Sequence, residues 1–135
     1  MTVLRPEGRA LLDTHAFLWW GNEPEKLSAR ARDFIAEETH EIFLSAVTAW
    51  EISVKYAKGQ LELPLPAEEY VLTRIGREGF RALAIEVSHA LHVGHLPPLH
   101  NDPFDRLLVA QSHLEDLPIL TSDARIAAYG VEVIW

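Results

Sequence analysis

The sequence predicts an α/β fold built on a mainly parallel sheet. Short apolar runs alternate with longer helical stretches along the chain, which is typical of α/β proteins. The 135 residues are 48% hydrophobic and 24% charged, which suits a single globular domain covering residues 1–135. Polar residues follow several of the apolar runs, and parallel sheets bind their ligands beyond the carboxyl ends of the strands.

The short apolar runs are the predicted strands, and the helices are expected between them. In chain order, the strands are expected at residues 9–13, 42–44, 82–87, 118–121 and 131–135. Helical segments are expected within residues 15–21, 26–38, 45–59, 63–79, 88–98, 103–114 and 124–129. Ser28 and Ser45 are suited to cap two of these helices, because a serine hydroxyl accepts a bond from a free amide there. Phe34 and Ile35 are expected to face the core, and Gly59 suits a helix end.

Charge and composition limit the kind of partner. Twelve Lys and Arg against twenty Asp and Glu give a formal net charge of -8, which argues against binding nucleic acid mainly by nonspecific attraction to phosphate. A bound cation can still reverse the local sign at an acidic site. There is no cysteine, so disulfides and thiolate metal sites are excluded. The first nine residues lack the apolar core of a signal peptide, and no apolar run reaches the ~18 residues of a membrane span. We therefore expect a cytoplasmic protein with no membrane partner.

Four carboxylates stand near the ends of the predicted elements. Asp13 and Asp123 follow strands, Glu51 lies in a helix with few polar positions, and Asp105 falls in the first turn of its helix. Carboxylates that close repel one another unless a proton or a cation separates them. If one edge of the sheet collects all four, the sequence predicts a site for a hard cation such as Mg²⁺ or Mn²⁺.

Each of these acids also has a purely structural explanation. Asp13 and Asp123 are suited to cap helices, and Asp105 favours the helix N-terminus behind a cap by Asp102. Glu51 can pair with Lys55, four residues on. The structural and metal-binding roles are compatible, because a capping carboxylate has a second oxygen.

Two rival sites use other chemistry. A zinc site would use imidazoles from the run of histidines, but Gly94 and Pro97 interrupt the helix and the HExxH motif is absent. The histidines concerned are His89, His92, His95 and His100. A phosphatase would use Asp13 as nucleophile, but its motif needs a second acid where His15 stands. Tryptophans can stack bases or anchor the core; they are Trp19, Trp20, Trp50 and Trp135.

Five segments of the chain are informative in combination: LLDTHAFLWW, KLSARARDFI, IFLSAVTAWEISVKYAKGQLEL, LPPLHNDPFDRLLVAQS and LPILTSDARIAAYGVEVIW. Taken together and in this order, they resemble a PIN domain and, more narrowly, a VapC-type toxin of a type II toxin–antitoxin pair. The resemblance implies a three-layer α/β/α fold with a central, mainly parallel sheet. It also implies a metal-dependent ribonuclease, usually a homodimer, that a cognate antitoxin holds inactive. Carried over by position, the catalytic and metal-binding acids are Asp13, Glu51, Asp105 and Asp123.

The implied reaction is hydrolysis of RNA phosphodiesters with one or two Mg²⁺ or Mn²⁺ ions. Thr14 and Ser122 are expected to hold waters or phosphate, and Arg106 or Lys55 to contact the scissile phosphate. The antitoxin is expected on the helix at residues 15–21 and on the helix after Leu27. The alternative is a noncatalytic PIN-like binding module that keeps the fold and uses the acids only for folding.

Overall fold

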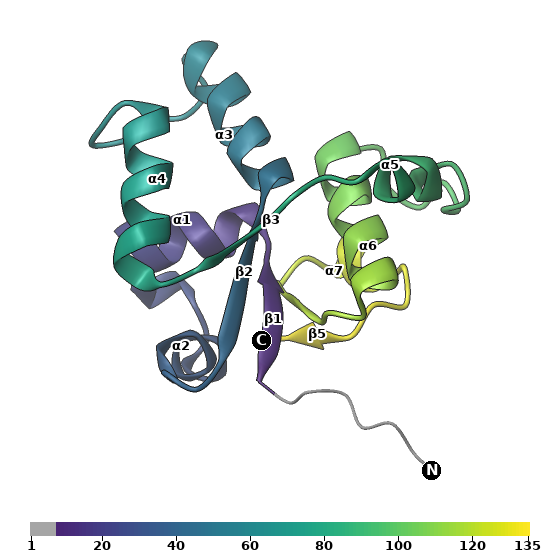
Figure 1. The fold of residues 1–135 in the computed structure, drawn as a ribbon, viewed down its shortest axis with the longest axis horizontal. Coiled ribbons are helices and arrows are strands. Elements are labelled where there is room, and N and C mark those ends of the chain that lie inside the picture. Colours follow the sequence, from purple (N-terminus) through teal and green to yellow (C-terminus); the bar gives the residue numbers. More distant parts are fainter. Residues whose placement is uncertain (1–7) are drawn as a thin grey trace.

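The computed structural model describes residues 8–135 and contains one five-stranded sheet in this range (Figure 1). All four strand pairs are parallel, and the strand order is β3-β2-β1-β4-β5. The strands are β1 (Arg9–Leu12), β2 (Glu41–Ser45), β3 (Arg81–Leu83), β4 (Ile119–Leu120) and β5 (Val133–Ile134). The predicted α/β fold with a central parallel sheet is confirmed. The signal-peptide expectation rests mostly on residues 1–7, which lie outside the described range.

Helices cover both faces of the sheet (Figure 1). The helices are α1 (Thr14–Asn22), the 3₁₀ turn η1 (Pro24–Lys26), α2 (Ala29–Ala36), α3 (Ala46–Ala57), α4 (Ala67–Glu78), α5 (Val87–Val93), α6 (Pro103–Glu115) and α7 (Ala124–Ala127). No helix within residues 8–135 is long and apolar enough to cross a membrane.

Alternation along the strands divides the core in two. Ala10 and Leu12 of β1 pack on one face with residues from α1, α2 and α4, and Leu11 packs on the other with α6 and α7. Successive side chains of a strand point to opposite faces, so a central strand with helices on both sides is apolar throughout. Ile35 is buried and Phe34 packs against the first cluster, as expected.

The caps form as the sequence indicates. The Ser28 hydroxyl accepts a hydrogen bond from the Ala31 amide at 3.0 Å, and the Ser45 hydroxyl accepts one from the Val47 amide at 2.9 Å. Ser45 therefore ends β2 and begins α3 at the same residue. Gly59 follows the end of α3 with φ +71°, a left-handed conformation that glycine adopts without strain.

Four predicted strands extend past the observed ones, by one or two residues for β1 and β4 and by more for β3 and β5. Residues 84–87 are not a strand, because β3 ends at Leu83 and Val87 is already helical. A capping box between Glu86 and His89 begins α5: the Glu86 amide donates to His89 Nδ1 at 2.9 Å. At the sheet edge a strand pairs on one side only, so this local capping wins over strand pairing. The last strand is also shorter than residues 131–135 and covers Val133–Ile134.

Candidate active site

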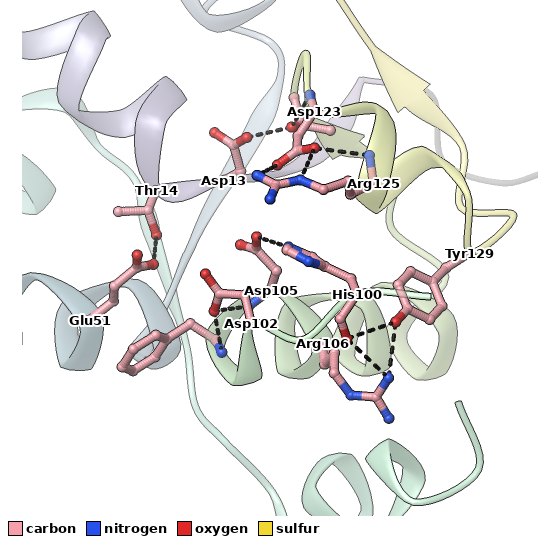
Figure 2. A network of polar contacts seen from close by, with 12 residues as sticks. Asp13, Thr14, Glu51, His100, Asp102, Asp105, Arg106, Asp123, Arg125 and Tyr129 are labelled. Carbon is pink, nitrogen blue, oxygen red and sulfur yellow. Dashed lines mark hydrogen bonds and ion pairs between the residues drawn. The ribbon is translucent and has the colours of Figure 1, made fainter. Parts of the chain in front are cut away.

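The acids lie toward the carboxyl ends of the central strand β1 and its neighbour β4 (Figure 2). Asp13 follows β1, and Asp123 follows β4, its partner in the sheet. Glu51 comes from α3, which continues directly from β2, and Asp105 comes from the first turn of α6. The parallel topology therefore brings residues from four distant parts of the sequence to one edge of the sheet.

Asp13 is a buried carboxylate, with 5% of its surface exposed. Its Oδ1 accepts a hydrogen bond from the Ala16 amide at 2.6 Å and so caps α1, and its Oδ2 accepts one from the Thr121 hydroxyl. Burial raises the pKa of Asp13 to about 6, against the lowering effect of these two bonds, and the charge of Asp105 adds to the rise. The predicted cap is therefore present, and the second oxygen keeps a lone pair for a cation.

Thr121 connects the ends of β1 and β4. Its hydroxyl donates to Asp13 and accepts a hydrogen bond from the Asp123 amide at 3.0 Å. Because a threonine hydroxyl has one proton and two lone pairs, these two bonds fix the distance between both acidic positions. The sequence indicated a hydroxyl here but not that it bonds Asp13, 108 residues away.

Asp123 caps α7 and forms an ion pair with an arginine. It accepts hydrogen bonds from the Arg125 amide at 2.9 Å and from the Arg125 guanidinium at 3.2 Å (Nε) and 3.1 Å (Nη2). Burial alone raises the pKa of Asp123, but the bonds and charge of Arg125 hold it below its usual value. Figure 2 shows the guanidinium beside the acids. Sequence reasoning missed Arg125. Ser122, between Thr121 and Asp123, is exposed, and its role stays a prediction.

Glu51 is buried, with 3% of its surface exposed, and faces α1. Its Oε1 accepts a hydrogen bond from the Thr14 hydroxyl at 2.7 Å, and its Oε2 pairs with Lys55 Nζ at 2.5 Å. The hydrogen bond to Glu51 raises the pKa of Lys55. The Thr14 oxygen also lies 3.1 Å from the hydroxyl of Thr48, which is fully buried and which the sequence did not single out. The pair with Lys55 expected from the sequence is therefore present, in addition to the contact with Thr14.

Asp105 lies between two other acids and a histidine. Burial raises its pKa; the hydrogen bond from His100 opposes the rise, and the charges of Asp102 and Glu51 add to it. Asp102 itself caps α6, because its Oδ1 accepts hydrogen bonds from the amides of Phe104 at 2.8 Å and Asp105 at 3.2 Å. The capping role expected for Asp102 is therefore present.

His100 is the histidine that reaches the acids. Its Nε2 lies 2.8 Å from Asp105 Oδ2, and its side chain is 7% exposed. His100, Asp105 and Asp123 each present one ligand atom, all within 4.8 Å of one another, and they form the group of this kind found within residues 8–135. The sequence singled out His100 only as one of four histidines of a rival zinc site, and did not predict that it lies against Asp105.

The remaining histidines do not join a zinc site with His100. His89 is buried and bonds Glu115 Oε1 at 2.8 Å, and His92 Nε2 lies 3.2 Å from His113 Nδ1. His95 is exposed. Among the tryptophans, Trp50 is 48% exposed and packs on Phe104, whereas the others pack against the core; these are Trp19, Trp20 and Trp135.

Arg106 points away from the acids (Figure 2). Its guanidinium donates to the Tyr129 hydroxyl at 2.9 Å and to four backbone carbonyls between α5 and α6; these belong to Val93, Leu96, Pro97 and His100. All this bonding is directed at the protein itself. We therefore assign Arg106 to holding this loop, in place of the phosphate contact expected from the sequence.

The donor set fits a hard divalent cation. The side chains that meet here offer carboxylate oxygens with one imidazole nitrogen, and no thiolate is present in the sequence. Burial and neighbouring acids raise the pKa of Asp13 and of Asp105, so the ionised forms are disfavoured until a positive charge joins them. Oxygen-rich sets of this kind suit Mg²⁺ and Mn²⁺.

A family model described as PIN domain matches residues 10–132. This chain belongs to the PIN domain family. The chain is similar to Ribonuclease VapC22 of Mycobacterium tuberculosis (strain ATCC 25618 / H37Rv), which is 29% identical over 120 residues that cover 88% of this chain and 90% of the relative. Ribonuclease VapC16 of the same organism is 36% identical over 61 residues, 45% of this chain and 43% of the relative.

Solved structures share the PIN fold. VapBC2 from Rickettsia felis, bound to a DNA fragment from its promoter, matches with a TM-score of 0.69 and 12% identity over 93% of this chain and 96% of that one. FitAcB from Neisseria gonorrhoeae matches with a TM-score of 0.62 and 20% identity over 92% and 95%. At these identities the likeness shows the fold, and the function of this PIN domain has to be argued from its site.

Proposed function

We propose that this PIN domain protein is a divalent-metal-dependent endoribonuclease and the toxin of a toxin–antitoxin pair. The observation that supports the proposal is that Asp13, Glu51, Asp105 and Asp123 come from elements that reach one edge of the sheet. Ligand atoms of Asp105 and Asp123 lie within 4.8 Å of each other, and the charges of Glu51 and Asp105 act on Asp105 and Asp13, respectively. A relative covering most of the chain is named a ribonuclease, which supports RNA as substrate. Structural neighbours described as VapBC complexes support a cognate antitoxin as partner.

The four acids are the residues that would hold one or two Mg²⁺ or Mn²⁺ ions, directly or through water. Such an ion supplies a water nucleophile at neutral pH and stabilises negative charge on the phosphate oxygens during hydrolysis. Thr121 orients Asp13, and Thr14 orients Glu51 through a 2.7 Å hydrogen bond. These hydroxyls hold the carboxylates in place, so the side chains need little rearrangement when a cation binds.

Two clefts beside the acids suit a single RNA strand. One, of about 290 Å³, is lined by Glu51 and by His15 and Trp19, whose ring centroids lie 5.5 Å apart. The other, of about 670 Å³, is lined by His100, Asp102, Phe104 and Arg125. Lys55 lines both clefts. Aromatic rings stack on bases and cations attract phosphates, so Lys55 and Arg125 place positive charge in these clefts beside the acids.

Induced expression followed by mapping of new RNA ends tests the function. The wild type is expected to arrest growth and produce discrete cuts, and Asp13→Asn to do neither. Asp102→Asn is the matched control, because it removes an equal charge from a neighbouring acid that we assign to the helix cap. Growth arrest without new RNA ends, or equal cutting by Asp13→Asn, contradicts the proposal.

The noncatalytic module is the competing function. It keeps the same fold but uses the acids only for folding and capping, and Asp13 and Asp123 do cap α1 and α7. Calorimetric titration of Mg²⁺ and Mn²⁺ into the wild type and Asp13→Asn separates the two. If the wild type binds the ions and Asp13→Asn binds them more weakly, the result supports the enzyme. If neither protein binds them, the result supports the noncatalytic module.

The proposed assembly is a cytoplasmic homodimer held inactive by the antitoxin. We expect the antitoxin to cover apolar surface on α1 and α2 and to bring a basic side chain to the acids, where it takes the electrostatic role of the cation. Sedimentation of the purified protein checks the dimer. Equally tight inhibition by an antitoxin peptide without any Lys or Arg contradicts the charge-replacement part.

A further inference from the structure

The imidazole of His100 lies among the acids of the site, although the four ligands expected from the sequence are all carboxylates. His100 is more than nine-tenths buried, and its Nε2 is 2.8 Å from Asp105 Oδ2. Nε2 also belongs to the group of ligand atoms, with one oxygen each of Asp105 and Asp123, that all lie within 4.8 Å. Figure 2 shows the ring directed at Asp105 and the acids beyond it.

The backbone around His100 is fixed independently of Asp105. Arg106 donates to the His100 carbonyl at 3.5 Å, to Pro97 O at 3.0 Å and to Val93 O at 3.2 Å, so one guanidinium joins the end of α5 to the start of α6. The same group bonds the Tyr129 hydroxyl at 2.9 Å. A side chain whose backbone is held in this way is preorganised to bind a ligand.

We infer that His100 is a nitrogen ligand of the cation bound by Asp105 and Asp123, and that it makes the site prefer Mn²⁺ to Mg²⁺. The inference rests on the proposed metal-dependent function. Neighbouring ligands of an octahedral ion with bonds of ~2.1 Å lie ~3 Å apart, which matches the 2.8 Å between His100 Nε2 and Asp105 Oδ2. A cation bound to both atoms would take the place of the hydrogen bond between them.

The preference follows from ligand chemistry. Mg²⁺ is a hard ion that takes oxygen ligands and keeps several waters, whereas transition ions also accept imidazole. Replacing an oxygen by a nitrogen therefore favours Mn²⁺ more than Mg²⁺. A histidine that only bonded and oriented Asp105 would affect both ions alike.

Pulsed electron paramagnetic resonance of bound Mn²⁺ tests this directly, because it detects a coordinated imidazole nitrogen. We expect the nitrogen coupling in the wild type and its loss in both His100→Gln and Asp105→Asn. His15→Gln is the matched control, since the charge of His15 also acts on Asp13, and it is expected to keep the coupling. Absence of the coupling in wild type with Mn²⁺ bound, or its persistence in His100→Gln, overturns the inference.

Binding titrations give a second, independent measurement. His100→Gln is expected to weaken Mn²⁺ binding by about 10-fold to 100-fold and Mg²⁺ binding clearly less. Equal losses for the two ions overturn the inference and leave His100 as a positioning residue. If His100→Gln fails to fold, the nitrogen coupling in the wild type still decides. Failure of the proposed function has a different result, in which the wild type binds neither ion.

Discussion

Replacing Asp13 by asparagine is expected to stabilise the metal-free protein at neutral pH. Asparagine caps a helix about as well as aspartate, so the bond from the Ala16 amide is kept. What is removed is the cost of ionising a buried carboxyl. Raising the pKa of Asp13 from 3.8 to about 6 corresponds to about 3 kcal/mol at a pH above both values.

The stability difference between Asp13→Asn and the wild type is expected to depend on pH. Because the folded protein binds the Asp13 proton more tightly than the unfolded chain, the wild type has the full contribution below pH 3.8 and loses it as the pH rises through about 6. The stabilisation of Asp13→Asn is therefore expected to be near zero at pH 4 and to reach about 3 kcal/mol at pH 7.5.

Urea unfolding in EDTA at pH 4, 5, 6 and 7.5 measures this difference. With a slope of about 1.5 kcal/mol per molar urea, the midpoint at pH 7.5 is expected to rise by about 2 M. Asp123→Asn is the contrasting variant. The pKa of Asp123 is lowered in the folded protein, so its ionised carboxylate is stabilised there, and replacing it is expected to destabilise the protein slightly at pH 7.5. An effect of Asp13→Asn that is destabilising at pH 7.5, or the same at every pH, refutes the reasoning.

Three further substitutions test the supports of the site. Thr121→Val removes a buried hydroxyl that bonds Asp13 and the Asp123 amide. We expect the free energy of unfolding to fall by about 1–3 kcal/mol in urea and Mn²⁺ binding to weaken. Unchanged Mn²⁺ binding contradicts the role of Thr121 in connecting the two acids. Arg106→Met is expected to speed amide hydrogen exchange in residues 94–101 while α4 stays protected; equal protection contradicts the loop assignment. Gln111→Leu removes buried bonds to Ser45 Oγ at 2.5 Å and Ala84 O at 3.1 Å; we expect about 1–3 kcal/mol lower stability, and a neutral effect in unfolding contradicts it.

The sequence predicted the parts of the fold that local chemistry determines. Residues 10–12 of β1 and both residues of β4 are apolar because both of their faces are covered, and Ser28 and Ser45 cap helices because serine bonds nearby amides. The predicted end of β3 was wrong because the residues after Leu83 can either extend the strand or form the capping box of α5, and they form the capping box. That competition depends on the strand being at the edge of the sheet, which a single sequence does not reveal.

That the four acids lie toward one edge of the sheet was also predicted from local position, since residues that follow parallel strands meet at one edge. The residues that support them were not. Thr48 contacts Thr14 only because α3 packs beside α1. Arg125 and His100 lie close in sequence to the acids that they bond, but the direction in which their side chains turn depends on the folded chain. Arg106 turns away from the acids to bond Tyr129 and the loop before α6. Asp13 and Asp123 both cap helices, and this capping is compatible with the cation binding proposed for them.

Cleavage of RNA by the purified protein tests the central claim most directly. The wild type, Asp105→Asn and Asp102→Asn are compared on one RNA, first in EDTA and then with Mn²⁺ or Mg²⁺ added back. We expect no cleavage in EDTA, cleavage by the wild type and Asp102→Asn once the ion is restored, and a loss of at least about 100-fold in Asp105→Asn. Cleavage that persists in EDTA, or that Asp105→Asn retains in full, contradicts the account.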